Sequence, residues 1–288
     1  MKCKLFETQQ CVQDLIWAIN SPSLIVPSAV LPQLSESMVD PVHLQAFLAR
    51  DSTAKVGLYF ERLILYWLKY IRGFELVAHA EAVRVDGKTL GELDFLFVDE
   101  RGRLTHWEVA IKFYLYLPKE PWRGSRFVGP NSNDNFERKT RRLFEHQLPM
   151  SHQVRDDVEI REAVVKGSAF YPPESVSAPI LPEFMSANHE CGRWVHRSEL
   201  HEVVDAKGAY QILSKPFWLS ALTADENQAT LLSRDEFVAS VDRTLQEFDR
   251  PILAVRWENA TGKSSSSSCF VHRFFIVPER WPDSGPAK

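Results

Sequence analysis

The sequence is poor in cysteine, and its few cysteines are widely spaced. Its 288 residues include only Cys3, Cys11, Cys191 and Cys269, which lie far apart and form no CxxC pair. Small disulfide-stapled domains and zinc ribbons need denser or regularly spaced cysteines. We therefore expect reduced thiols and a cytoplasmic location.

The sequence also lacks a long uninterrupted apolar run. Its first fifteen residues, MKCKLFETQQCVQDL, contain no apolar h-region, so they predict no secretory leader. The longest apolar stretch, GLYFERLILYWLKYI, is broken by Glu61, Arg62 and Lys69 and is too short to cross a bilayer. We expect no membrane partner.

Net charge and known motifs exclude little more. The formal net charge of -4 gives no global electrostatic case for binding nucleic acid, so any such case must be local. Gly262, Lys263 and Ser264 do not form a phosphate loop, because Trp257 stands where that motif needs a glycine. No GxSxG or Cys/His pattern indicates acyl chemistry.

A group of histidines around one cysteine remains open to a weak zinc interpretation. His189, Cys191, His196 and His201 lie within thirteen residues. Their spacing matches no common zinc finger, so we do not adopt a zinc site as the main hypothesis.

Periodicity predicts a mixed α/β fold. Helical spacing of apolar residues covers 53–71, with Ser52 or Thr53 as N-cap and Gly73 after the end. Alternating patterns predict three strands that follow it, and an Asp-Gly turn joins the first two. A further helix and strand complete the series: strands 74–85, 91–99 and 104–116, helix 135–148 and strand 161–172.

We divide the chain into three parts on this basis. Residues 1–52 are a helical lead-in, 53–172 a core, and 173–288 an α+β C-terminal extension of unknown role. The extension is expected to contain a strand at 215–222, a helix at 233–248, and two strands that flank a polar low-complexity loop at 258–268.

Two of the core strands carry charged residues on one face. Side chains alternate along a strand, so Glu108, Ala110 and Lys112 share a face, and Glu92 and Asp94 share one in the preceding strand. A tight antiparallel pairing would place Asp94 beside Glu108. Glu and Lys are also routine on the solvated face of an antiparallel sheet, and that interpretation stays open.

A facing pair of acids is chemically informative. Two carboxylates repel each other, and one is pushed toward protonation unless a cation lies between them. Mg²⁺ is typically held by one or two carboxylates, waters and phosphate oxygens. The pattern therefore favours metal-assisted phosphodiester cleavage with Mg²⁺ or Mn²⁺.

The order of elements, with GELDF followed by HWEVAIK, resembles the PD-(D/E)XK nuclease superfamily over about residues 53–172. The chain as a whole is similar to an uncharacterised bacterial family grouped with that superfamily. The resemblance implies a core of helix, three-stranded meander, helix and strand, and a nuclease that acts on nucleic acid, DNA in particular.

The resemblance also assigns site residues. It implies that Asp94 and Glu108 are metal ligands, with Val109 as a further ligand, and that Glu61 is an auxiliary acid from the first core helix. A plain surface glutamate explains Glu61 equally well. Lys112 would stabilise charge on the phosphorane. The superfamily pattern places its lysine two residues after the second acid, where this chain has Ala110. A catalytically inactive module that binds nucleic acid or a protein partner is therefore the alternative.

Basic residues follow the third strand. Lys139 and Arg142 share a flank of the predicted helix, and Arg123 and Arg126 lie in the loop before it. Such a margin can hold phosphates despite the acidic total, although a solvated helix face explains the same residues.

Overall fold

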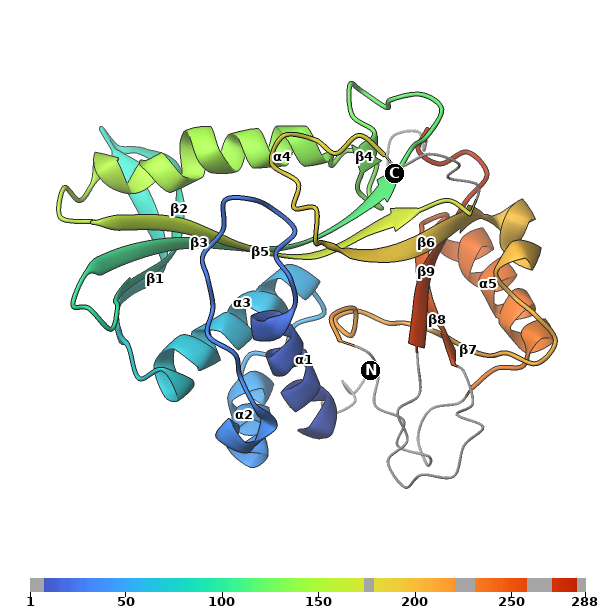
Figure 1. Ribbon diagram of the computed structural model, residues 1–288, viewed down its shortest axis with the longest axis horizontal. Helices are drawn as coiled ribbons and strands as arrows, with labels where there is room; N and C mark the ends of the chain where they lie inside the picture. Colours follow the sequence, from blue (N-terminus) through green and yellow to red (C-terminus); the bar gives the residue numbers. More distant parts are fainter. Residues whose placement is uncertain (1–7, 174–178, 221–230, 258–270, 284–288) are drawn as a thin grey trace. The chain divides into compact units, whose positions relative to one another are not determined.

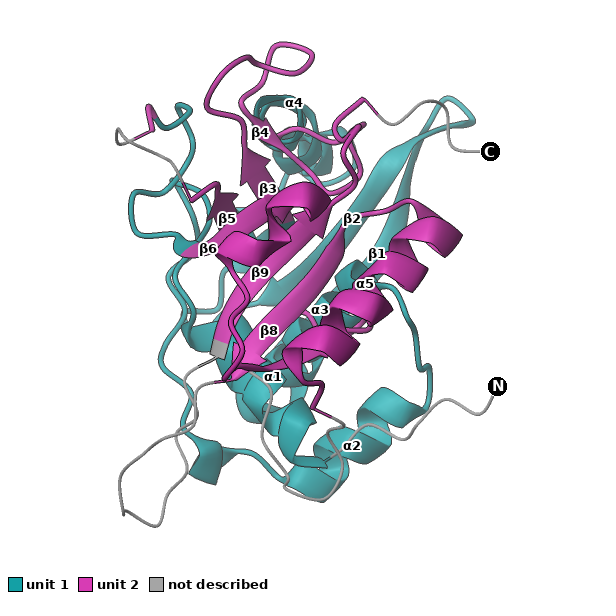
Figure 2. Ribbon diagram, turned by 90° about the vertical axis from the view of Figure 1, so that its right-hand side faces the viewer, with its two compact units in different colours: residues 1–112, 137–167, 181–190 teal, residues 113–136, 168–180, 191–288 magenta. Residues whose placement is uncertain are grey.

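The computed structural model describes residues 8–173, 179–220, 231–257 and 271–283. These residues fall into two compact units that interleave along the chain (Figure 2). Unit 1 comprises residues 1–112, 137–167 and 181–190, and unit 2 comprises 113–136, 168–180 and 191–288. Helices and strands mix in both units, which confirms the α/β class. The three predicted segments have different bounds from these units.

Unit 1 contains the amino-terminal helices and most of the predicted core. Its elements are α1 (Thr8–Asn20), η1 (Glu36–Met38), α2 (Pro41–Ala49), α3 (Val56–Tyr66), η2 (Trp67–Ile71), β1 (Glu75–Val85), β2 (Lys88–Val98), most of α4 (Phe136–Arg142), η3 (Leu143–Gln147) and η4 (Leu148–Gln153). Strands β3 (Leu104–Tyr116) and β5 (Ile160–Tyr171) begin in unit 1 and continue into unit 2.

Unit 2 is built around the C-terminal strands. Its elements are β4 (Phe127–Val128), β6 (Glu190–His196, whose first residue belongs to unit 1), η5 (Arg197–Glu202), β7 (Ala209–Ile212), α5 (Arg234–Phe248), β8 (Ile252–Trp257) and β9 (Val271–Val277). Strand β9 pairs parallel with β6 and antiparallel with β8, which pairs antiparallel with β7. Phe237 and Val241 of α5 pack into the core of these strands.

The helix predicted at 53–71 is present but begins later and changes its winding. Helix α3 starts at Val56 after Lys55, and no side chain caps it, so the predicted Ser52 or Thr53 cap is wrong. The Thr53 hydroxyl instead accepts a hydrogen bond from the Lys55 N–H at 3.0 Å, which forms a local turn before the helix. The last turn is π-helical, and Gly73 with φ +65° follows it as predicted.

The predicted strands of the core are confirmed as a meander. Strands β1 and β2 pair antiparallel, as do β2 and β3, and the joining residues Asp86 and Gly87 both have positive φ. This conformation suits the expected Asp-Gly hairpin turn.

The strand predicted at 215–222 is wrong for the part that the structure describes. Phe217 and Trp218 donate their N–H groups to Ser214 and Pro216, which makes turns rather than a ladder. Pro216 has no N–H to offer a sheet. Strands β6 and β7 were not predicted, and the loop at 258–268 lies outside the described residues.

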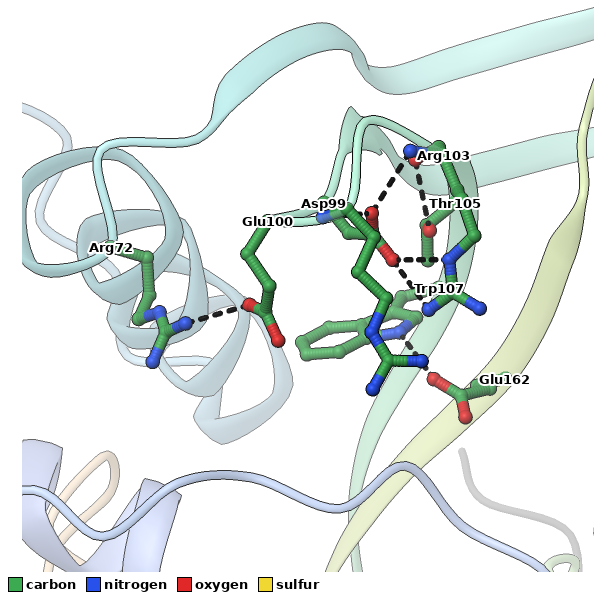
Figure 3. A network of polar contacts seen from close by, with 8 residues as sticks. Arg72, Asp99, Glu100, Arg103, Thr105, Trp107 and Glu162 are labelled. Atoms are coloured by element: carbon green, nitrogen blue, oxygen red, sulfur yellow. Dashed lines mark hydrogen bonds and ion pairs between the residues drawn. The ribbon is translucent and has the colours of Figure 1, made fainter.

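The turn between β2 and β3 is fixed by one carboxylate, Asp99 (Figure 3). Its Oδ1 accepts the backbone N–H groups of Arg101 and Arg103 at 2.9 Å, and its Oδ2 accepts two guanidinium N–H groups of Arg103 at 2.9 and 2.7 Å. Turn geometry sets hairpin register, which here pairs Phe95 with Trp107.

Strands β3 and β5 meet closely at a glycine. Gly167 of β5 has φ +137°, and a Cβ there would lie 1.7 Å from the carbonyl oxygen of Lys112 on β3. Since L side chains rarely adopt this φ, only glycine suits the position.

Helices cover both faces of the strands in unit 1. Helices α1 to α3 lie on one side and α4 with the turns after it lies on the other (Figure 1). The Trp67 ring of η2 stacks on Trp107 of β3 with centroids 6.2 Å apart, whereas Gln147 of η3 bonds to Glu108. Neighbouring residues of β3 thus face different helices, as strand alternation requires.

Candidate functional site

The predicted acid pair lies where the β2–β3 ladder ends. The register runs from Val98–Leu104 to Phe95–Trp107, and its continuation sets Asp94 opposite Glu108. There the Asp94 Oδ2 accepts the backbone N–H of Val109 at 2.8 Å. At this point a side-chain oxygen of β2 accepts the β3 backbone N–H beyond the last backbone pair of the ladder. This bond holds Asp94 next to the strand that carries Glu108.

Glu108 is a buried carboxylate with both oxygens bonded. Its side chain is 1% exposed. Oε1 lies 3.0 Å from His106 Nε2, and Oε2 accepts from Gln147 Nε2 at 2.6 Å. His106 is itself fully buried, and its Nδ1 has no hydrogen-bond partner within the described part of the chain. Because each oxygen of Glu108 has a hydrogen-bond partner, the cost of burying the carboxylate is reduced.

The two carboxylates interact electrostatically. The pKa of Asp94 is raised to about 8, first by burial and next by the charge of Glu108. The Val109 N–H lowers this pKa, and the charges of Glu61 and Glu92 add to the increase. Asp94 without a cation therefore prefers to hold a proton at neutral pH.

This donor set suits a hydrated divalent ion. Two facing carboxylates, one of them partly exposed, match the one or two that Mg²⁺ takes from proteins while keeping several waters. Within the described residues no group of three or more His, Cys, Asp and Glu side chains gathers closely enough to hold an ion. Among the described residues, an ion at this site would therefore have only Asp94 and Glu108 as carboxylate ligands, and the Val109 N–H, which donates to Asp94, fixes one of them.

Glu61 approaches the pair from another direction. Its Oε1 lies 2.8 Å from His79 Nε2, and the His79 ring stacks on Phe95 with centroids 4.8 Å apart. Phe95 and Asp94 are adjacent and point to opposite faces of β2. The structure lets the charge of Glu61 reach Asp94 but does not bring the two into one ion-binding group with Glu108.

Lys112 lies four residues beyond Glu108 on β3 and is partly exposed. Its backbone carbonyl is the group that Gly167 approaches. Two residues of strand separate Lys112 from the position of Ala110, about 6.6 Å at ~3.3 Å per residue. Strand alternation predicts that the Lys112 side chain lies on the face of Glu108.

The predicted basic residues divide between the two units. Lys139 is partly buried and Arg142 exposed, and both belong to α4 in unit 1, the helix that leads into Gln147. Arg123 and Arg126 belong to unit 2. There Arg123 bonds to Asn133 at 2.9 Å, and Arg126 bonds to the carbonyls of Leu117 and Pro118 at 3.0 and 2.7 Å. These two arginines organise their own loop.

Two residues of this site were not singled out from the sequence. His106 could have been, because it lies two residues before Glu108 and therefore shares its face. Gln147 carries no such signal. The π-helical turn of η3, which an α-helical pattern does not predict, orients it toward Glu108.

The other sequence features add no second site. Cys191 is exposed and in no disulfide, His189 is buried, and neither belongs to an ion-binding group in the ranges that the structure describes. Gly262, Lys263 and Ser264 lie outside those ranges. No helix in the described ranges has the length and apolar character that a membrane span requires.

Comparison with known families places the chain. A family model described as a domain of unknown function, DUF1853, matches residues 13–277. The chain belongs to the DUF1853 family. No curated protein and no solved structure matches it significantly. The DUF1853 family description carries no activity, so function has to be argued from the acid pair itself.

Proposed function

We propose that this DUF1853 protein is a metal-dependent phosphodiesterase that acts on nucleic acid, with DNA as the favoured substrate. The observation that carries the proposal is the Asp94–Glu108 pair, in which burial and a facing carboxylate raise the pKa of Asp94 to about 8. Two acids in this arrangement destabilise the folded chain unless a proton or a cation offsets them. A resemblance of the surrounding elements to PD-(D/E)XK nucleases supports the same activity.

Each residue has a role that follows from its place. Asp94 and Glu108 would hold Mg²⁺ or Mn²⁺, and the Val109 N–H and Gln147 fix their carboxylates. The chemistry that such an ion supplies when bound is activation of a water and neutralisation of phosphate charge. Lys112, on the face of Glu108, donates to the phosphate oxygens as negative charge develops on them.

A metal-linked thermal melt tests this proposal. The wild-type protein should gain stability with Mg²⁺ or Mn²⁺ by mass action, and Asp94→Asn and Glu108→Gln should lose that gain. Glu75→Gln is the matched control, since Glu75 is exposed and pairs with Val98 of β2, four residues along that strand from Asp94. Cleavage of single- and double-stranded DNA and RNA with each ion then identifies the substrate. If wild type and both site variants respond alike to the metal, the site is wrong.

One observation favours a non-catalytic alternative. Ala110 stands where the PD-(D/E)XK pattern has its lysine, so the chain could keep the fold to bind nucleic acid or a protein. Metal-linked stabilisation together with absence of cleavage on every substrate would support this alternative. Absence of both would exclude the metal site as well.

A further inference from the structure

Glu108 is held from two separate elements. His106 comes from the same strand, two residues earlier, whereas Gln147 comes from η3, thirty-nine residues later. The Gln147 bond, at 2.6 Å, is the shorter of the two. It therefore links β3 to the helical segment that covers this face.

The chemistry of Gln147 matters as much as its position. An amide N–H donates to a carboxylate but carries no charge, whereas a lysine or arginine in its place would neutralise Glu108. Gln147 thus orients one oxygen of Glu108 without placing a charge beside it. A carboxylate has about four lone-pair positions. The bonds from His106 and Gln147 leave capacity for a further ligand.

We infer that Gln147 is a positioning residue for the metal ligand Glu108, a role that rests on the proposed function. Gln147 ends the π-helical turn that directly follows α4, the helix of Lys139 and Arg142. One continuous segment thus carries both the basic flank and the donor that orients Glu108. Outer donors of this kind typically account for about 10- to 100-fold in metal affinity.

Gln147→Met tests the inference, because methionine keeps the length and helix propensity of glutamine but cannot donate. Gln153→Met is the matched control, since Gln153 is exposed and lies six residues further along the same helical segment. Mn²⁺ binding to the full-length proteins is measured by calorimetry, and thermal melts are recorded in EDTA. Gln147→Ala in the same assay provides a second variant without a donor, and circular dichroism in EDTA identifies variants that fold.

We expect Gln147→Met to weaken Mn²⁺ binding by roughly tenfold or more, while Gln153→Met binds as the wild type does. A merely structural role predicts a lower melting temperature in EDTA with an unchanged dissociation constant, and that result would overturn the inference alone. Failure of the wild type to bind Mn²⁺ would instead overturn the proposed function, and the role of Gln147 with it.

Discussion

Among the residues of unit 1 that the structure describes, two carboxylates are buried, Asp14 in the helical layer and Glu108 on β3, and hydrogen bonding does not distinguish them. Asp14 is fully buried and accepts from Gln10 Nε2 at 3.0 Å and from the Tyr59 hydroxyl at 2.9 Å. Glu108 is equally buried and also bonded at each oxygen. Both satisfy the ordinary requirement for a buried acid.

The two acids differ in the neighbours that respond to their charge. Burial first and Asp14 next raise the pKa of the Cys11 thiol to about 12, and the same two causes raise that of the Tyr59 phenol. Both groups are neutral at pH 7 even without this shift. The neighbour whose pKa the charge of Glu108 raises is the carboxylate of Asp94. On the proposed function, the buried acid that faces a second acid binds an ion, whereas the buried acid that faces neutral donors has a structural role.

Removal of Asp14 should have the largest effect on stability. Asp14→Ala leaves the buried Gln10 amide and Tyr59 hydroxyl without this acceptor, and we expect a loss of roughly 3 kcal/mol in the free energy of unfolding. Glu108→Gln keeps the shape, removes a repulsion and should cost less. Urea denaturation measures both. Metal-linked stabilisation should survive in Asp14→Ala and vanish in Glu108→Gln, and the comparison fails if the two variants behave alike.

Two lysines show the same contrast between a residue of the proposed site and a structural residue. Lys112→Ala should lower kcat by roughly 100-fold with little change in substrate affinity, because its charge acts on the transition state. Lys166, buried on β5, donates to the backbone carbonyls of Ile19 and Ser21 at the end of α1, so Lys166→Met should lower the melting temperature without lowering kcat of the folded enzyme. Steady-state kinetics and melts separate the two. A fully active Lys112→Ala protein would move the search for the charge stabiliser to Lys139.

A pH series without metal sharpens the comparison further. The folded pKa of Asp94, about 8, lies above the ordinary aspartate value of 3.8, so between these values the folded state binds the proton more tightly than the unfolded state. Stability from this group is therefore present at low pH and is lost as pH rises toward 8. We expect Asp94→Asn to flatten the fall in melting temperature between pH 6 and pH 8. An equally steep fall in both proteins would place the titration elsewhere.

The smallest effect concerns the basic flank. Lys139→Ala with Arg142→Ala should remove about two phosphate contacts and flatten the dependence of log affinity on log salt by ~1.8 for duplex DNA or ~1.4 for a single strand. Sequence preference should not change, because phosphate contacts do not read bases. The measurement uses Glu108→Gln protein in Ca²⁺ and without metal. An unchanged slope would mean that Lys139 and Arg142 form a solvated helix face and do not contact phosphates.

Much of this arrangement is readable from the sequence because strands have a period of two. That period correctly gave the limits of β3, and the Asp-Gly turn correctly joined β1 to β2. The short loop between β2 and β3 then set the register in which these two strands pair. The class of fold could be predicted from the same local signals.

Other parts depend on long-range packing and could not be predicted this way. The bond from Gln147 to Glu108 spans thirty-nine residues and a π-helical turn. The contact between Glu61 and His79, whose ring stacks on Phe95, likewise joins two elements that local sequence signals do not connect. The false strand at 215–222 shows the converse, since an apolar segment can be buried without pairing: Trp218 and Leu219 are buried there in turns.

Gly167 has a consequence for how substitutions along this chain will be tolerated. It carries no functional group, yet any side chain there would collide with the main chain of Lys112 and require a φ of +137°. Saturation mutagenesis should therefore find position 167 as intolerant as position 108, for a wholly different reason. On the proposed function, position 108 requires a carboxylate, whereas position 167 requires that there be no side chain. Added Mn²⁺ separates the two cases. A high concentration of the ion should restore a variant with weakened metal affinity at position 108, but no ligand can relieve the steric clash of a side chain at position 167.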